Sequence, residues 1–368
     1  MLGKAESGGV DSGGNSGSGG NSGAGGNSGN NSAGDGNPFT LFYDPSNINI
    51  PYEYMLYGTS GVLYVQVDDA AKVPYGGNYG TLSIKGVAAP ASTIKIYGTF
   101  ISIKVSHNPI HSDDIDKFIY DIVSFGSNKL TGFKFGENIR NVPDSLPSSV
   151  NSLNASFGSY DSDLGQRYFT GEDITEWDVS NVKDFGQAFT YCKHLTVSLD
   201  NWDYSNAQSL EQFLGGSSGQ FGNYVFPSEL SKTQGVFSGT IEKNLSMTFD
   251  SNVISQSIFW GGLDIQTDVS VAINLPNITN LNALFISSKF RSGSKITVNA
   301  QSATILTNLF NSVQFIGDCS VNLNVGTTDP SSFASMFRYA DFTQATESVK
   351  DWARSLGAAN DNTVIGLN

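Results

Sequence analysis

One phrase is written twice within 25 residues, and it restricts the folds open to this chain. Residues 177–189 read WDVSNVKDFGQAF and residues 202–214 read WDYSNAQSLEQFL, so that Trp177 recurs as Trp202. An active site is assembled once, from residues far apart in sequence. A phrase repeated at a fixed distance instead marks a structural unit that stacks on its neighbour. The sequence therefore predicts a repeat architecture.

A nine-residue frame inside the phrase continues along the chain. The frame NVKDFGQAF has apolar side chains at its fifth, eighth and ninth places, and frames ending at residues 157, 189, 214, 237, 259, 285, 310 and 337 follow the pattern with steps of 32, 25, 23, 22, 26, 25 and 27 residues. A period near 25 residues is typical of leucine-rich-repeat solenoids. The predicted core of the repeat consists of Phe157, Phe185, Phe189, Leu210, Phe213, Phe237, Phe259, Leu281, Phe285, Leu306, Phe310, Phe333 and Phe337.

Each period combines two patterns. The apolar places of the frame have the i, i+3, i+4 spacing of a helical stripe, which predicts a short helix or helical turn with one buried face. Alternating runs such as VSVAINL (269–275), KITVNA (295–300) and SVNLNV (320–325) predict strands with one face inward. A unit of one strand and one short helix is too small to bury its own apolar face, so stacking is expected to bury it against the next unit.

The repeated phrase resembles the repeats of a known family. The wording W-D-[VY]-S-N-[VA] over residues 177–214 is similar to that of BspA-type leucine-rich-repeat proteins and of the related repeats of bacterial surface lipoproteins. The similarity is looser from there to about residue 340 and absent from the first 110 residues. The resemblance implies a leucine-rich-repeat-like solenoid and a role in adhesion or surface recognition. Similar repeats also occur in viral and phage attachment proteins.

The chain before the solenoid divides into two regions. Residues 1–37 are rich in Gly, Ser and Asn, with Gly at every third position from 14 to 29. This composition predicts a flexible tail or linker, and the alternative is an extended helix with three residues per turn. Residues 38–110 contain short alternating runs between Gly and Pro clusters, which predict an antiparallel β domain.

Three further regions complete the predicted organisation. Residues 111–148 are expected to hold a helix over 113–125 and the approach to the solenoid, which spans 149–341. Residues 342–368 are expected to form a capping helix that ends at Gly357, followed by a short tail. The predicted stripe of the helix over 113–125 comprises Ile115, Phe118, Ile119 and Ile122. The fold class is thus mainly β, or α+β.

No catalytic or metal-binding constellation emerges from the sequence. Cys192 and His194 supply two ligands, whereas a closed zinc site needs four. Acidic pairs can serve a glycosidase or bind calcium, but each pair also fits a solvated loop or a helix start. We therefore assign no catalytic, cofactor or metal site. The residues considered were His107, His111, His194, Cys192, Cys319, Asp113, Asp114, Asp161, Asp163, Glu172 and Asp173, with Trp177 and Trp202 as candidates for sugar stacking or core packing.

Composition narrows the class of function. Only 15% of the residues are charged, against ~25% in ordinary globular chains. The net charge of −14 argues against nucleic acid as a partner, because phosphate binding needs a basic field. The amino terminus lacks the apolar stretch of a signal peptide, and no run of ~18 apolar residues that could span a membrane occurs.

These observations favour a non-enzymatic structural or adhesion protein at a surface. We expect a virion component, such as a phage fibre, spike or capsid decoration, that presents the solenoid for recognition. The alternatives are a bacterial cell-surface adhesin and a glycan-cleaving attachment enzyme. The expected partners are other virion or surface proteins and a glycan or protein receptor on the host surface, with self-association left open. The expected location is the virion or the cell exterior.

Overall fold

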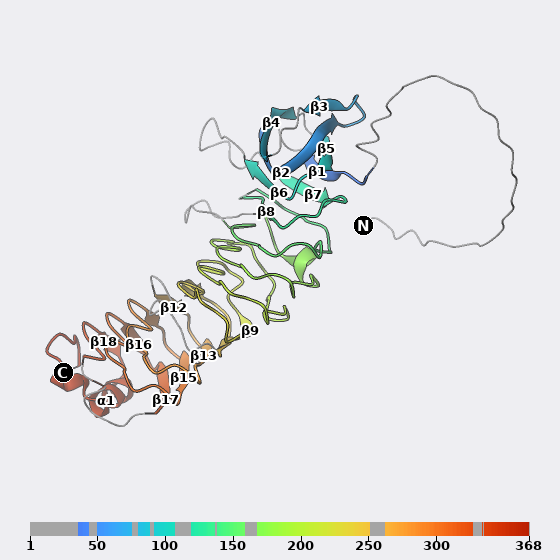
Figure 1. Ribbon diagram of the computed structural model, residues 1–368. Helices are drawn as coiled ribbons and strands as arrows, with labels where there is room; N and C mark the ends of the chain where they lie inside the picture. The colour runs from blue at the N-terminus through green and yellow to red at the C-terminus, as the bar shows by residue number, and fades with distance from the viewer. Residues whose placement is uncertain are drawn as a thin grey trace, which may run out of the picture. The chain divides into compact units, whose positions relative to one another are not determined.

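The fold is known from a computed structural model (Figure 1). The described residues lie in one compact unit, Ala33–Asn368. Of the predicted tail 1–37, only Gly36 and Asn37 fall among the described residues. The structure describes residues 36–43, 50–75, 80–88, 92–106, 119–136, 138–158, 168–250, 262–326, 333 and 335–367.

The N-terminal part forms an eight-stranded sheet, whose first six strands lie in the region 38–110 predicted to be an antiparallel β domain. Its main path has the order β7-β1-β5-β2-β6-β8, and β3 and β4 both pair with β2. The pairings are antiparallel except that of β6 with β8, which is parallel. The strands are β1 (Phe39–Tyr43), β2 (Ile50–Val67), β3 (Val73–Tyr75), β4 (Gly80–Ala88), β5 (Thr93–Thr99), β6 (Ser102–Ser106), β7 (Tyr120–Ser124) and β8 (Gly132–Lys134).

The helix predicted over 113–125 is wrong in its described part. Tyr120–Ser124 form strand β7, which pairs antiparallel with β1 so that Leu41 faces Ile122. Ile122 is buried, whereas Val123 is 56% exposed. Its neighbours on the expected stripe, Ile115 and Phe118, lie outside the described residues. The segment is a strand because the edge of β1 supplies a hydrogen-bonding partner, a long-range condition that the local pattern cannot reveal.

The solenoid predicted from the repeats is present and contains two parallel five-stranded sheets. One sheet has the longer strands β9 (Gly222–Phe226), β11 (Leu245–Phe249), β13 (Ser270–Asn274), β15 (Lys295–Ala300) and β17 (Ser320–Val325). The other has β10 (Gly239–Ile241), β12 (Leu263–Ile265), β14 (Lys289–Phe290), β16 (Gln314–Gly317) and β18 (Asp341–Ala345). Ser270 pairs with Lys295 and Lys295 with Ser320, so the register advances by one repeat per strand.

The frames form runs of turns outside the two sheets, so the short helices predicted there are absent and single turns, the other predicted form, take their place. The Ala188 N–H donates to Phe185 O at 3.1 Å, a bond that closes one turn. The Gln187 and Phe189 N–H groups instead donate to carbonyls of the following repeat, at Glu211 and Phe213. The backbone therefore alternates between local turns and a ladder that joins neighbouring repeats.

Left-handed residues explain why no helix forms in these frames. The seventh place of the frame has a positive φ in every described copy, and the residue two places after the frame does too. An L-residue in this conformation costs ~1–2 kcal/mol and ends the right-handed helical path. The seventh-place residues are Ala155, Gln187, Gln212, Gly235, Ala283, Asn308 and Ser335, with φ between 53° and 66°.

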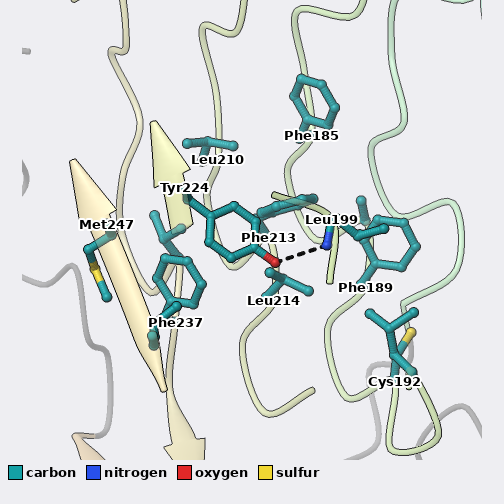
Figure 2. Close-up of a cluster of buried hydrophobic side chains, with 14 of the residues drawn as sticks. Phe185, Phe189, Cys192, Leu199, Leu210, Phe213, Leu214, Tyr224, Phe237 and Met247 are labelled. Atoms are coloured by element: carbon teal, nitrogen blue, oxygen red, sulfur yellow. Dashed lines mark hydrogen bonds between the residues drawn. The ribbon is translucent and has the colours of Figure 1, made fainter. Parts of the chain in front are cut away.

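One continuous core runs through the sheet and the solenoid. The ninth-place phenylalanines stack from repeat to repeat. The ring centroid of Phe310 lies 5.6 Å from that of Phe285 and 5.3 Å from that of Phe337. Figure 2 shows Phe189, Phe213 and their neighbours filling the space between successive turns. Because each ring contacts the rings before and after it, the burial that one repeat cannot achieve alone is supplied by stacking.

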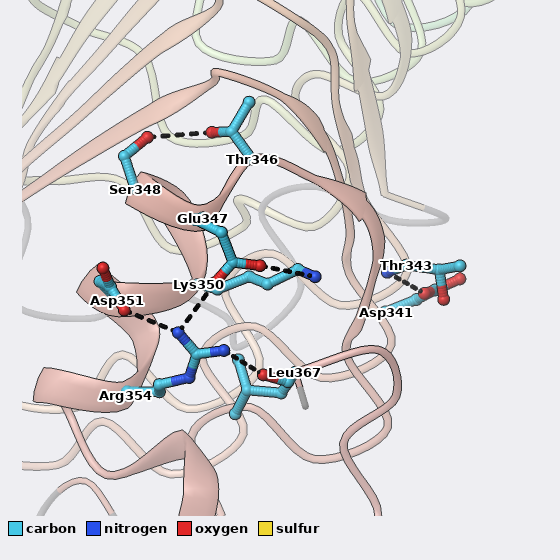
Figure 3. A network of polar contacts seen from close by, with 9 residues as sticks. All are labelled: Asp341, Thr343, Thr346, Glu347, Ser348, Lys350, Asp351, Arg354 and Leu367. Atoms are coloured by element: carbon cyan, nitrogen blue, oxygen red, sulfur yellow. Dashed lines mark hydrogen bonds and ion pairs between the residues drawn. The ribbon is translucent and has the colours of Figure 1, made fainter.

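A helix and the C-terminal segment cover the end of the solenoid. A helix is present within the region 342–368 predicted to cap the solenoid, as α1 (Glu347–Ser355) followed by the left-handed Gly357, whereas residues 342–345 belong to strand β18. The Phe342 N–H donates to Ile365 O at 2.8 Å, which adds a last rung after β18. Arg354 contacts Glu347, Asp351 and the Leu367 carbonyl (Figure 3). Two short 3-10 helices, Glu172–Ile174 and Ala358–Asn360, lie elsewhere in the described chain. Among the described helices, none has the length and apolarity needed to cross a membrane.

Candidate functional site

The outer side of the long-strand sheet is the candidate site, and we call it the strand face. Along these strands buried residues alternate with less buried ones, because successive side chains point to opposite sides of a sheet. Lys295 is its one charged side chain. The strand face consists of Asn223, Val225, Ser246, Thr248, Ser270, Ala272, Asn274, Lys295, Thr297, Asn299, Ser320, Asn322 and Asn324.

The parallel register arranges these side chains in rows that run across the strands. One row holds Thr248, Asn274, Asn299 and Asn324, one from each of four successive strands. The adjoining row holds the shorter side chains of Ser246, Ala272 and Thr297 and ends at Asn322. Neighbouring strands lie ~4.8 Å apart, so each row repeats a chemical group at that spacing.

The first row is a hydrogen-bonded ladder of amides, which we call the amide ladder. The Asn324 Nδ2 donates to Asn299 Oδ1 at 2.6 Å, and the Asn299 Nδ2 donates to Asn274 Oδ1 at 2.7 Å. The Asn274 Nδ2 in turn donates to Thr248 Oγ1 at 3.1 Å. All the donors point toward the earlier strand, so the ladder has a direction. Each amide is oriented by a neighbour, which lowers the freedom that a ligand would have to freeze.

The amide ladder keeps unused hydrogen-bonding capacity. A carboxamide has two N–H donors and an oxygen with two lone pairs. Within the described chain, Asn299 uses one N–H and one lone pair, and Asn324 Oδ1 accepts nothing. Asn299 is half-buried and Asn324 is exposed, so solvent reaches the ladder. The strand face thus offers paired donors and acceptors at regular intervals.

The described residues of the predicted repeat core lie inside the solenoid and do not form a site. Eleven of them are buried, with at most 2% of their surface exposed: Phe157, Phe185, Phe189, Leu210, Phe213, Phe237, Leu281, Phe285, Leu306, Phe310 and Phe337. Phe333 is half-buried, and Phe259 lies outside the described residues. Trp177 and Trp202 are also buried, with 3% and 5% exposed. The two indoles are therefore core residues and cannot serve as an open platform for sugars.

The scattered polar candidates are not brought together where the structure describes them. Cys192 and Cys319 are both buried free thiols, and the Cys192 Sγ lies 3.3 Å from the Phe157 carbonyl. His194 is exposed on a turn. The remaining candidates His107, His111, Asp113, Asp114, Asp161 and Asp163 lie outside the described residues.

Asp173 is the described carboxylate whose pKa is raised above its ordinary value. Burial raises its pKa, and the Val142 N–H, which donates to Oδ2 at 3.1 Å, opposes this rise. Nearby Asp121, Glu172 and Asp144 raise the pKa further. Over the described part of the chain, no group of three or more His, Cys, Asp or Glu side chains has a geometry that could hold a metal ion. Asp173 therefore serves to anchor the loop at Val142.

Sequence reasoning did not single out the amide ladder, although a signal was present. Asn274, Asn299 and Asn324 occupy the same phase of three alternating runs, each 25 residues after the last. The strands were predicted from the apolar residues that face the core, and this pattern says nothing of the polar residues between them. A repeat that conserves its spacing for core residues aligns its surface residues too, and identical surface residues in register form a ladder.

Comparisons with known proteins give one family match. A family model described as "Mycoplasma protein of unknown function, DUF285" matches residues 147–225. This segment includes the repeated phrase around Trp177 and Trp202, and the match supports its repeat-family character. Searches of the curated proteins and of the solved structures found no match.

Proposed function

We propose that this protein is a non-enzymatic recognition protein of an exterior surface, and that the strand face is what it presents to a receptor. The observation that carries the proposal is the strand face itself. It gathers neutral hydrogen-bonding side chains from five successive strands into fixed rows, with one charged side chain among thirteen positions. Such a surface suits contacts made by hydrogen bonds, repeated along the sheet and insensitive to ionic strength.

We place the protein on a virion, with a bacterial cell surface as the second candidate location. The repeated W-D-x-S-N wording supports an exterior role by resemblance, and the low charge density fits a surface that avoids electrostatic steering. Single contacts of this neutral kind are weak. Several copies engaged together can exceed one-site affinity by ~10²–10⁴, so multivalent display would make such a surface effective.

The test compares the monomeric chain with the same chain displayed in many copies on beads, for binding to bacterial cells at low and high salt. Replacing Thr297 with Arg places a long charged side chain in the middle of the strand face. Replacing the exposed Thr304, which lies in a frame outside the strand face, with Arg is the matched control. We expect the displayed chain to bind at both salt concentrations, Thr297→Arg to lose binding, and Thr304→Arg to retain it.

Two results would count against this function. Equal binding by the Thr297→Arg variant would remove the strand face from the interaction. Release of new reducing ends from cell polysaccharide during incubation would show turnover, and the glycan-cleaving alternative would then replace a recognition role.

A further inference from the structure

We propose that the strand face binds a neutral polysaccharide that lies across the strands, along the amide ladder. This proposal rests on the proposed recognition function and names its ligand class. The ladder offers an unused N–H and an unused carbonyl lone pair at Asn299, held in place by bonds of 2.7 Å and 2.6 Å to Asn274 and Asn324. The ligand that matches such a surface must itself be periodic, and must carry groups that both donate and accept hydrogen bonds.

A polysaccharide satisfies both conditions. Sugar hydroxyl groups donate one hydrogen bond and accept others, as do serine and threonine hydroxyls. Groups on successive strands repeat every ~4.8 Å, a spacing comparable to the length of one sugar ring in an extended chain. Beside the amide ladder lie the short side chains of Ser246, Ala272 and Thr297, which allow the polysaccharide to approach the amides closely.

The charge of the strand face selects a neutral polymer. A polyanion requires a basic surface, and the strand face has only Lys295, in a row with the neutral Ser270 and Ser320. A polycation requires carboxylates, and none of the thirteen side chains is acidic. Burying an unpaired charge against these amides would be costly, so charged polysaccharides are disfavoured.

The same residues argue against a protein partner at this face. The centres of protein interfaces are enriched in aromatic residues, Met and Arg, which fill pockets on the partner. The strand face has none of these, and Val225, 56% exposed, is its one large apolar side chain. A polymer of hydroxyl groups matches the array better than a folded surface does.

The experiment is native affinity electrophoresis of the full chain in gels that contain dextran, mannan, galactomannan or hydroxyethyl cellulose. Gels with heparin or alginate provide the charged comparison. We expect at least one neutral polysaccharide to retard the protein equally at low and high salt, and the charged ones to leave it unretarded. The Asn299→Ser variant removes the ladder amide and should raise the Kd measured from retardation by ~2- to 10-fold, the effect of about one hydrogen bond.

Two variants separate loss of binding from loss of fold. Thr297→Arg blocks the face without removing a ladder bond, so it should weaken retardation even if Asn299→Ser lowers the melting temperature. Thr304→Arg should leave retardation unchanged. The proposal is overturned if no neutral polysaccharide retards the protein, if only charged ones do, or if Thr297→Arg binds as tightly as the unmodified chain. A third outcome separates the two proposals. If the Thr297→Arg variant no longer binds cells and the unmodified chain binds no neutral polysaccharide, recognition by the strand face stands and the proposed ligand class is wrong.

Discussion

The indole ring of Trp177 lies parallel to that of Trp202, at an interplanar angle of 9° and a centroid distance of 6.4 Å. Each indole N–H donates to a backbone carbonyl of the preceding turn, Trp177 to Pro143 O at 2.9 Å and Trp202 to Ile174 O at 3.0 Å. The repeated phrase therefore places a tryptophan at the same buried position in two successive turns. A tryptophan recurs because its ring must stack on the previous ring and its N–H must find a partner inside the core.

The left-handed frame position predicts opposite effects for two substitutions of one alanine. Ala283 has a φ of 60°, a conformation in which glycine has no steric penalty and a β-branched residue has a large one. Ala283→Gly is expected to raise the free energy of unfolding by up to ~1 kcal/mol, because relief of strain exceeds the entropic cost. Ala283→Val is expected to lower it by ~1–3 kcal/mol. Urea denaturation followed by circular dichroism measures both.

Ala272 is the matched control for Ala283, because it lies in the middle of strand β13. There the order reverses: Ala272→Gly should destabilise by ~0.5–1 kcal/mol, and Ala272→Val should be neutral or slightly stabilising. The same order of Gly and Val at both positions would contradict the left-handed assignment at Ala283.

The stacked phenylalanines predict a large cost for truncating one of them. Phe310 is fully buried between Phe285 and Phe337, so Phe310→Ala leaves a cavity with neighbours on both sides. We expect a loss of ~3–5 kcal/mol in the free energy of unfolding. Ile305 in the same frame is 45% exposed, and Ile305→Ala should cost less than ~1 kcal/mol. A similar small loss for both variants would argue against a continuous core at this repeat.

The period and the inward residues of the solenoid were predictable, whereas the conformation of the frames was not. Phe285 and Phe310 had to be buried whether the frame was helical or not, because residues at i, i+3 and i+4 meet on one side of a helix and also of this run of turns. The discriminating feature is the positive φ at Gln212, Ala283 and Asn308. None of these is glycine, so composition gives no sign of it. Backbone hydrogen bonds to the next repeat impose this conformation, such as the bond from the Gln212 N–H to Gln234 O at 2.8 Å. A local sequence pattern does not reveal these bonds.

The Arg354 contacts at the capping helix predict a local change in stability. Arg354 joins Glu347 at 3.2 Å, Asp351 at 2.6 Å and the Leu367 carbonyl, so Arg354→Ala releases the C-terminal segment from α1. Its side chain is one-third exposed and its two carboxylate partners are mostly exposed, so we expect only a small loss in the free energy of unfolding. Hydrogen exchange measured by mass spectrometry should become faster in 341–345.

The effect of Arg354→Ala should be confined to the end of the solenoid. Peptides from β11 should exchange at an unchanged rate, because a repeat contacts only its neighbours. The exposed Arg338 provides the control, since Arg338→Ala removes a charge near the same end without touching α1. Equal acceleration in β11 and β18 would mean that the solenoid opens as a whole.

The two thiols are predicted to be unreactive while the protein is folded. Burial raises the pKa of Cys319 to about 11, and it raises the pKa of the fully buried Cys192 further. At pH 8 the thiolate fraction of Cys319 is then about one thousandth, against roughly a quarter for a free cysteine. We expect iodoacetamide to alkylate Cys319 at least ~100-fold more slowly in the folded chain than in urea. Labelling at the rate of a free thiol would show that the site is open.

The contacts of Asp318 predict that part of the free energy of unfolding is lost at acidic pH. The Ser292 hydroxyl donates to its carboxylate at 2.6 Å and the Gly293 N–H at 2.9 Å, and these bonds lower its pKa below the ordinary value of 3.8. The folded pKa is below the unfolded one, so this stabilisation is complete above the unfolded pKa and is lost as the pH falls through the folded pKa.

An Asp318→Asn variant should therefore lose less stability than the unmodified chain as the pH falls below about 4. Ser292→Ala removes the stronger donor and should reproduce part of that change. Urea unfolding at a series of pH values measures both. An unchanged acid profile in the two variants would show that the Asp318 contacts do not survive in solution.

The parallel pairing of β8 with β6 is compatible with folding in chain order. The Thr131 N–H donates to Ile101 O at 2.7 Å and the Phe135 N–H donates to Ser156 O at 2.8 Å, so the first solenoid turn is built on a sheet already present and offers its own edge to the next. During synthesis at ~5–20 residues per second, a 25-residue turn leaves the ribosome in about one to five seconds. When a turn emerges, the preceding turn can already be folded and offer its edge for pairing. The solenoid can then fold at the rate of translation, from its amino-terminal end to α1.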